Sequence, residues 1–375
     1  ERFRAAGFNT LIADEAHMLR NLDTELTQSF ISIVAPETSK STDKLPEYRL
    51  LVTGTPIVNG MPDILAFLSV LGEPVIKNWL DLKRAGLTVR SYVKGLAPAF
   101  RRSNQSEMLQ RLWQQRLSSF MVRRLKKDVL DLPAKVYETL PVAISTADEY
   151  AQAESNFLQY MRAEGVKVTE AAALQKLNEL HAIAALGKVA PVADYLKNIQ
   201  GKTIIFCTRI ESLENLRKAL GSGLLFTGAL AKGARQAAID KFQDDPSERF
   251  FLGTYEAGGV GITLTSSSKV ILLDLPWTPA AKGQAEDRAH RVGQKTTVSV
   301  VTVIAKGTID EHTLTILAKK EALIAQMVDG KDRELARKTS VAAEVLRSIR
   351  AQASQVGAAQ GQTGPIRWVD FEQGS

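Results

Sequence analysis

Residues 8–17 read FNTLIADEAH, an apolar run that ends in two acidic residues. Short apolar runs of this kind are typical of strands buried in a parallel α/β sheet. Residues 49–56, RLLVTGTP, repeat the pattern with an apolar run followed by a polar turn. Ligands of parallel sheets bind at the carboxyl ends of the strands. We therefore expect the polar residues that follow both runs to lie at one edge of a sheet.

Asp14 and Glu15 are the two acidic residues that follow the first run. Phosphoryl transfer needs a carboxylate that holds Mg²⁺ and a polar group that orients the attacking water. Asp14 would hold the metal ion through its water shell, and Glu15 would polarise the water. Acidic residues are also common in the solvated first turn of a helix, where the helix dipole favours them. These residues alone leave both interpretations open.

A second α/β unit is predicted from about residue 201. Its expected strands cover residues 203–207, 250–254, 269–274 and 298–304. A helix is expected at 211–220, ended by Gly221, and another at 285–290. The intervening residues 73–140 read as basic and helical, and 146–186 as helices rich in Ala, Gln and Glu.

These patterns predict four segments along the 375 residues. They are the first α/β unit at 1–72, a helical insertion and linker at 73–185, the second α/β unit at 186–330, and a polar, partly disordered tail at 331–375. The net charge of +7 fits a polyanionic partner without requiring one. The single cysteine excludes a disulfide within the chain, and no apolar run is long enough to span a membrane. We expect an intracellular protein, in the cytoplasm or nucleoid of a bacterium or phage host, or in a eukaryotic nucleus.

Six motifs then occur in a fixed order. Asp14–His17 resembles motif II of superfamily-two helicases, and Thr53–Pro56 resembles motif III. The segment 121–135 is similar to the stretch that joins the two lobes of Swi/Snf proteins. Residues 203–208 resemble motif IV. Residues 258–264 resemble motif V, which 274–279 extend, and residues 284–294 resemble motif VI. From about residue 7 to 317, the chain resembles the Swi/Snf family of DNA-translocating ATPases.

This resemblance implies two RecA-like parallel-sheet lobes, the first incomplete, with a helical insertion between them. It implies ATP and Mg²⁺ as cofactors, with Asp14 and Glu15 at the metal and His17 as a relay toward motif III. Gly259, Gly261, Gln284 and Asp287 would contact the nucleotide. The form QAEDR in motif VI is similar to the subgroup that anneals DNA and remodels forks.

Arg288 and Arg291 are three residues apart, so a helix would place both guanidinium groups on one face. Two such groups can stabilise the charge that develops on a transferred phosphoryl group, as arginine fingers do. The alternative is a surface helix with salt bridges from Glu286 and Asp287. The resemblance favours the arginine fingers.

Double-stranded DNA is the expected partner, bound through its phosphate backbone without base-specific reading. We expect the contacts at Gly54, Thr55, Thr208, Arg209, Thr227, Gly228, Thr254 and Trp277. For Trp277 a role in the core is equally compatible with the sequence. The basic run 123–127 is either a DNA surface or part of the segment between the lobes, and we favour the latter.

The chain contains no phosphate-binding P-loop, GxxxxGK followed by Ser or Thr. Gly201-Lys202-Thr203 ends like one, but Leu196 occupies the position of the first glycine and a strand follows instead of a helix. We expect the P-loop upstream of Glu1, in a missing segment of the first lobe. The alternatives are a non-catalytic remnant that binds DNA or a partner, and the motor part of a restriction or phage system.

Overall fold

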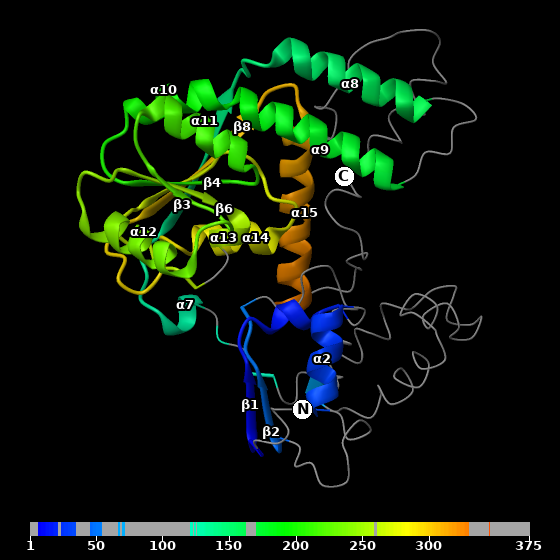
Figure 1. Ribbon diagram of the computed structural model, residues 1–375, viewed down its shortest axis with the longest axis vertical. Coiled ribbons are helices and arrows are strands. Elements are labelled where there is room, and N and C mark those ends of the chain that lie inside the picture. Colours follow the sequence, from blue (N-terminus) through cyan, green and yellow to red (C-terminus); the bar gives the residue numbers. More distant parts are fainter. Residues whose placement is uncertain are drawn as a thin grey trace. The chain divides into compact units, whose positions relative to one another are not determined.

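The computed structural model describes most of the predicted second unit and parts of the first (Figure 1). The described residues are 7–21, 24–34, 46–54, 67, 70–71, 121–122, 124, 126–162, 170–258, 261–329 and 345. The helices expected between 73 and 120 and most of the expected polar tail lie outside them. The chain divides into two compact units, Glu1–Arg123 with Lys320–Thr339 and Arg124–Lys319 with Ser340–Ser375.

The first unit contains a two-stranded parallel sheet of β1 (Thr10–Ala13) and β2 (Tyr48–Leu51), as the sequence predicts. A short 3₁₀ helix, η1 (Ala16–Leu19), follows β1, and helix α2 (Glu25–Val34) comes next along the chain. The prediction of a buried strand is correct only for its end. Ala13 is buried, but Phe8 and Ile12 are 56% and 64% exposed, so no other layer covers their side chains.

The second unit is built on a six-stranded sheet in the order β3-β8-β7-β4-β6-β5, with every neighbouring pair parallel. The strands are β3 (Lys135–Val142), β4 (Thr203–Cys207), β5 (Leu224–Phe226), β6 (Phe250–Thr254), β7 (Lys269–Leu272) and β8 (Val298–Ala305). All five residues of β4 and of β6 are buried, as in strands covered on both faces. The predicted α/β class with parallel sheets is confirmed.

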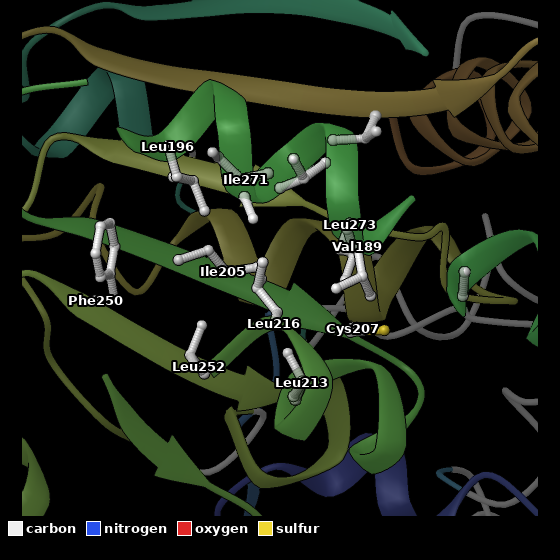
Figure 2. Packing of buried hydrophobic residues seen from close by; sticks show 14 of the residues in the cluster. Val189, Leu196, Ile205, Cys207, Leu213, Leu216, Phe250, Leu252, Ile271 and Leu273 are labelled. Carbon is white, nitrogen blue, oxygen red and sulfur yellow. The ribbon is translucent and has the colours of Figure 1, made fainter. Parts of the chain in front are cut away.

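Helices cover both faces of this sheet (Figure 1). On one face, α10 (Val189–Lys197) and α11 (Ile210–Leu220) pack against side chains of β4, β6 and β7, and Figure 2 shows this core around Ile205, Leu252 and Ile271. On the other face lie α12 (Lys232–Asp244), α13 (Tyr255–Gly258) and α14 (Pro279–Glu286). Helix α11 ends at Gly221 with φ 70°, as predicted.

A third apolar cluster joins α8 (Ala147–Arg162), α9 (Glu170–Gly187) and α15 (Ile309–Asp329). The helices predicted over 146–186 are therefore confirmed. The Tyr150 hydroxyl accepts a hydrogen bond from the Ile309 amide at 2.8 Å and so ties α8 to the start of α15. No helix of the described ranges is long and apolar enough to cross a membrane.

Strands β3 and β5 were not predicted. Both are edge strands, and β5 has only three residues. The middle of β3 is exposed, so its sequence lacks the continuous apolar run on which the other strands were identified. Strand β3 lies inside the range 73–185, for which only helices and a linker were expected. Its parallel pairing with β8 adds it to the sheet of the second unit.

Candidate functional site

Motif II forms a tight turn at the carboxyl end of β1. Glu15 has φ 49° and ψ 42° and is the only residue other than glycine with a positive φ in the part of the chain that the structure describes. The Glu15 amide donates a hydrogen bond of 2.8 Å to Asp14 Oδ1. Left-handed backbone costs a non-glycine residue on the order of 1 kcal/mol and is often found at functional sites. The turn presents the Asp14 and Glu15 side chains beside each other.

His17 lies beside the Glu15 carboxylate. The distance from His17 Nδ1 to Glu15 Oε2 is 3.1 Å, and the two side chains are 12% and 45% exposed. The carbonyl of His17 accepts a hydrogen bond of 3.2 Å from Arg20 Nη1, which fixes the backbone of the 3₁₀ helix. The approach of His17 to Glu15 is an ion-pair contact, since His17 Nδ1 makes no hydrogen bond among the described residues. The relay of His17 toward motif III stays a prediction.

Two backbone hydrogen bonds tie motif II to the residue that precedes motif III. The Val52 amide donates to the Ala13 carbonyl at 2.8 Å, and the Ala16 amide donates to the Val52 carbonyl at 2.9 Å. The pairing of β1 and β2 therefore continues past both strands and draws Thr53 and Gly54 toward the acidic turn. Thr55, the other expected DNA contact of this loop, lies outside the described residues.

The donor chemistry of Asp14 and Glu15 fits Mg²⁺. This ion prefers oxygen ligands and is usually held by one or two carboxylates together with waters and substrate phosphates. Asp14 is exposed at the end of its strand, and one of its oxygens is oriented by the Glu15 amide. In the described residues no group of three or more His, Cys, Asp and Glu side chains could hold a metal ion.

Motif VI begins on α14, which Thr278 caps by accepting a hydrogen bond from the Ala281 amide at 3.2 Å. The prediction of a helix over 285–290 was wrong beyond Glu286. The chain continues in turns. Their backbone hydrogen bonds span three residues instead of the four of an α-helix, from Arg288 N to Ala285 O and from Ala289 N to Glu286 O. The two arginines therefore follow the helix instead of sharing one of its faces.

Arg288 and Arg291 nevertheless converge on one backbone oxygen. Their Nη1 atoms donate to the Ile262 carbonyl, in motif V, at 3.2 and 3.3 Å. Arg288 is 6% exposed, and its own carbonyl accepts from the Leu264 amide at 2.9 Å. Arg291 is exposed. Arg288 thus joins motif VI to motif V, and Arg291 is the arginine that solvent or a nucleotide can reach.

The expected nucleotide contacts are placed differently from one another. The Asp287 carboxylate contacts Lys126 and, at 3.1 Å, Lys135. Gln284 is partly exposed on α14, and Gly261 is exposed with φ 34°. Gly259 lies outside the described residues. Nucleotide binding by these residues stays a prediction.

The expected DNA contacts of the second unit follow the carboxyl ends of parallel strands, at one edge of the sheet. Thr208 and Arg209 follow β4, Thr227 and Gly228 follow β5, Thr254 ends β6, and Trp277 comes after β7. Thr208 and Arg209 are partly exposed, and Gly228 is exposed, whereas Thr227 and Thr254 are 5% and 7% exposed.

Trp277 packs against the cluster of α8, α9 and α15, with its ring 4.9 Å from that of His181. This contact supports a role in the core, one of the two roles that the sequence left open. Contacts of this edge with DNA phosphates stay predictions.

Two domain families match the chain. The SNF2-related domain matches residues 1–186, and the helicase conserved C-terminal domain matches residues 184–293. The chain belongs to the SNF2-related family of helicase-like proteins.

SNF2-related relatives match most of the chain. The human DNA annealing helicase and endonuclease ZRANB3 is 25% identical over 88% of this chain and 30% of its own length. A Caenorhabditis elegans homologue of SWI/SNF-related matrix-associated actin-dependent regulator of chromatin subfamily A-like protein 1 is 30% identical over 85% of this chain and 46% of its own length.

A solved structure, the Sulfolobus solfataricus SWI2/SNF2 ATPase core in complex with dsDNA, is 24% identical with a TM-score of 0.44 and covers 86% of this chain and 69% of its own. The chain spans less than half the length of the human and Caenorhabditis elegans relatives.

Beneath the SNF2-related motifs lies a buried polar network that sequence reasoning missed. Asp274 is fully buried and accepts hydrogen bonds from the Thr208 amide at 2.8 Å and from the Thr208 hydroxyl. His181, on α9, places Nδ1 3.9 Å from Asp274 Oδ2, and its Nε2 lies 3.1 Å from the Leu275 carbonyl oxygen. Burial lowers the pKa of His181, and the nearby Asp274 carboxylate opposes this only in part. The network positions the Thr208 turn.

A buried charge pair lies outside the motifs. Lys188 Nζ donates to Asp310 Oδ2 at 2.7 Å, and both side chains are fully buried. Asp310 Oδ2 also accepts from the Ala305 amide at 3.0 Å, at the end of β8. The available signal was a lysine within the apolar residues of α9 and α10, where an unpaired charge would be costly.

Proposed function

We propose that this chain carries motifs II to VI of an ATP-dependent motor that moves along double-stranded DNA. The observation that carries the proposal is the ordered motif set within matched SNF2-related and helicase C-terminal domains. Movement follows when the two units cycle with ATP binding and hydrolysis and alternate their hold on the phosphate backbone. Strand separation is not required.

Asp14 would hold Mg²⁺, which when bound neutralises charge on the phosphates of ATP. Glu15 would accept a proton from the attacking water, with its carboxylate 3.1 Å from His17 Nδ1. Arg291, assisted by Arg288, would stabilise the charge that develops as the terminal phosphoryl group transfers. The exposure of Arg291 and the shared anchor at the Ile262 carbonyl support this assignment.

Arg209 and Gly228 are the contacts with DNA phosphates that their exposure supports best. Thr208 would contact a phosphate only if its amide or hydroxyl left Asp274, to which both donate. Gly54 and Thr55 would make the corresponding contacts from the first unit. Contacts through backbone amides and hydroxyl groups do not read sequence, so the motor would bind duplexes of any sequence. The name of the ZRANB3 relatives, DNA annealing helicase, extends the proposal to annealing of DNA strands.

A second function is favoured by one observation, which is that these 375 residues contain no P-loop sequence. The chain on its own would then bind DNA or a partner without turning over ATP. Lys202 illustrates why Gly201-Lys202-Thr203 does not substitute for a P-loop. Its Nζ donates to the carbonyls of Phe242 and Gln243 at the end of α12 and so caps that helix.

The test is ATP hydrolysis with and without duplex DNA, measured for the full-length product of the gene and for this chain alone. Glu15→Gln should lower DNA-stimulated turnover about 10²- to 10⁴-fold, as loss of a general base does. Arg291→Ala should lower it about 10³-fold or more. Arg217→Ala, which removes an exposed arginine of α11, is the matched control and should keep full activity.

Unchanged turnover in both Glu15→Gln and Arg291→Ala would refute the assigned roles. Turnover by the full-length product but not by this chain alone would assign the phosphate-binding function to residues outside the chain. Absence of DNA stimulation in every form would favour the non-catalytic function.

A further inference from the structure

A short segment of the second unit, Pro133–Tyr137, contacts the motif VI turn at both ends. At the start of the turn, Lys135 Nζ lies 3.1 Å from Glu286 Oε2 and 3.1 Å from Asp287 Oδ1. At its end, His290 Nε2 lies 2.7 Å from the Pro133 carbonyl oxygen. The segment therefore contacts the turn from Glu286 to His290 at both of its ends.

Glu286 is the centre of these contacts. Its side chain is 5% exposed, and its Oε2 also accepts a hydrogen bond of 3.1 Å from the Tyr137 hydroxyl. Its other oxygen, Oε1, lies 3.2 Å from Lys282 Nζ. Lys126 adds a contact with Asp287 from helix α7 (Lys126–Val129). Three lysines thus face two carboxylates.

Burial distinguishes this cluster from ordinary surface ion pairs. Exposed pairs contribute little to stability, because water screens them. Lys135 and Lys282 are only 18% and 13% exposed. Burial alone would lower the pKa of Lys135, but the carboxylates of Asp287 and Glu286 outweigh it, so the net shift is upward and the charge is retained.

These contacts hold the turn that contains Arg288 and precedes Arg291. The carbonyl of Glu286 accepts hydrogen bonds from the amides of Ala289 at 3.3 Å and His290 at 3.2 Å, so the backbone of the turn starts from Glu286. Arg288 lies within the turn from Glu286 to His290, and Arg291 follows its last residue. A displacement of Glu286 or His290 would therefore move both guanidinium groups away from the Ile262 carbonyl.

We propose that Lys135 and Glu286 are positioning residues that fix Arg291 for catalysis by holding the motif VI turn to the segment at Pro133–Tyr137. This segment follows directly on the stretch that leads out of the first unit at Arg123. The inference rests on the proposed function, since it assigns how the arginine finger is held.

The test compares Lys135→Met and Glu286→Gln with the wild type in steady-state ATP hydrolysis at saturating duplex DNA. Both substitutions remove a charge and nearly preserve shape. A misplacement of about 1 Å can cost about 10²-fold in rate, so kcat should fall between about ten- and a hundredfold. The KM for ATP should change by less than about threefold, because the arginine acts mainly in the transition state. Lys135→Arg should retain most of the activity.

Two further variants separate positioning from stability. In an Arg291→Ala background, Lys135→Met should cause a much smaller loss than in the wild type, because only Arg288 is left for Lys135 to act through. A multiplicative loss would overturn the inference. Lys241→Met removes a lysine that contacts Glu248 at an exposed site on α12 and should leave kcat unchanged.

The failure of the inference is distinguishable from the failure of the proposed function. A wild type without DNA-stimulated hydrolysis overturns both. A hydrolysing wild type with Lys135→Met and Glu286→Gln variants of unchanged kcat overturns the inference alone. Unfolding of both variants at the assay temperature, followed by circular dichroism, would assign the contacts to stability and likewise overturn it.

Discussion

The buried pair of Lys188 and Asp310 gives a prediction whose magnitude follows from the geometry. Both side chains are fully buried, and their charged atoms are 2.7 Å apart. In Lys188→Met, Asp310 would keep only the Ala305 amide as a donor to Oδ2. Removing one partner of a buried pair costs about 3 to 5 kcal/mol, because an uncompensated charge remains. The thermal midpoint should fall by roughly 6 to 20 °C, at about 2 to 4 °C per kcal/mol for a unit of about 200 residues.

The assay is urea and thermal unfolding followed by circular dichroism. Lys197→Met is the matched control, since Lys197 pairs with Asp194 on α10 with both side chains more than half exposed, and it should cost less than about 1 kcal/mol. The double variant Lys188→Met with Asp310→Asn should recover much of the loss, because it removes the buried charge. A Lys188→Met protein as stable as the control would show that Asp310 is not a buried, charge-paired carboxylate.

The remaining predictions concern a glycine and a histidine. In Gly258→Ala, the added Cβ would lie 2.5 Å from Cε1 of the buried Phe206 ring, so the free energy of unfolding should fall by about 1 to 3 kcal/mol. In the control Gly233→Ala, on α12, the added Cβ meets no atom within 4 Å, so the change should be neutral or slightly stabilising. Equal effects of the two substitutions in urea titrations would contradict this packing. Burial lowers the pKa of His181, so the unfolded chain takes up a proton near its ordinary pKa of about 6.5 while the folded chain does not. Stability should therefore be fully present above this pH and decline as the pH falls through it, and His181→Gln should remove that part of the decline; a variant with the wild-type pH profile between 5 and 7.5 would count against it.

How much of the fold the sequence predicts depends on where each strand lies. Strands β4 and β6 are buried on both faces, so their apolar runs appear in the sequence and were predicted with their observed bounds. Strands β3 and β5 lie at the two edges of the sheet and were not predicted. The exposed middle of β3 lacks an apolar run, and β5, although apolar, has only three residues. The helix expected at 285–290 lies earlier, as α14 at Pro279–Glu286, and the residues after it bond to motif V through Arg288 and Arg291.

The candidate site divides in the same way. The residue types of motifs II and VI are compatible with phosphoryl transfer, and the resemblance to the Swi/Snf family favours that role over the structural alternatives. The partners of these residues do not follow from local spacing, because Lys135 lies more than 150 positions from Glu286, and His181 lies 93 positions before Asp274. Long-range pairs of this kind are brought together only by the order of the strands. The salt bridges from Glu286 and Asp287, which the sequence offered as an alternative to arginine fingers, are present and have Lys135 as a partner.

Movement along DNA is the central claim, and displacement of a third strand from a duplex tests it most directly. A motor that tracks the duplex strips a bound triplex-forming oligonucleotide only while it hydrolyses ATP. We predict ATP-dependent release by the full-length product of the gene, and no release by its Glu15→Gln variant or with a non-hydrolysable ATP analogue. Release that is independent of ATP, or equal in Glu15→Gln and the wild type, would contradict the claim.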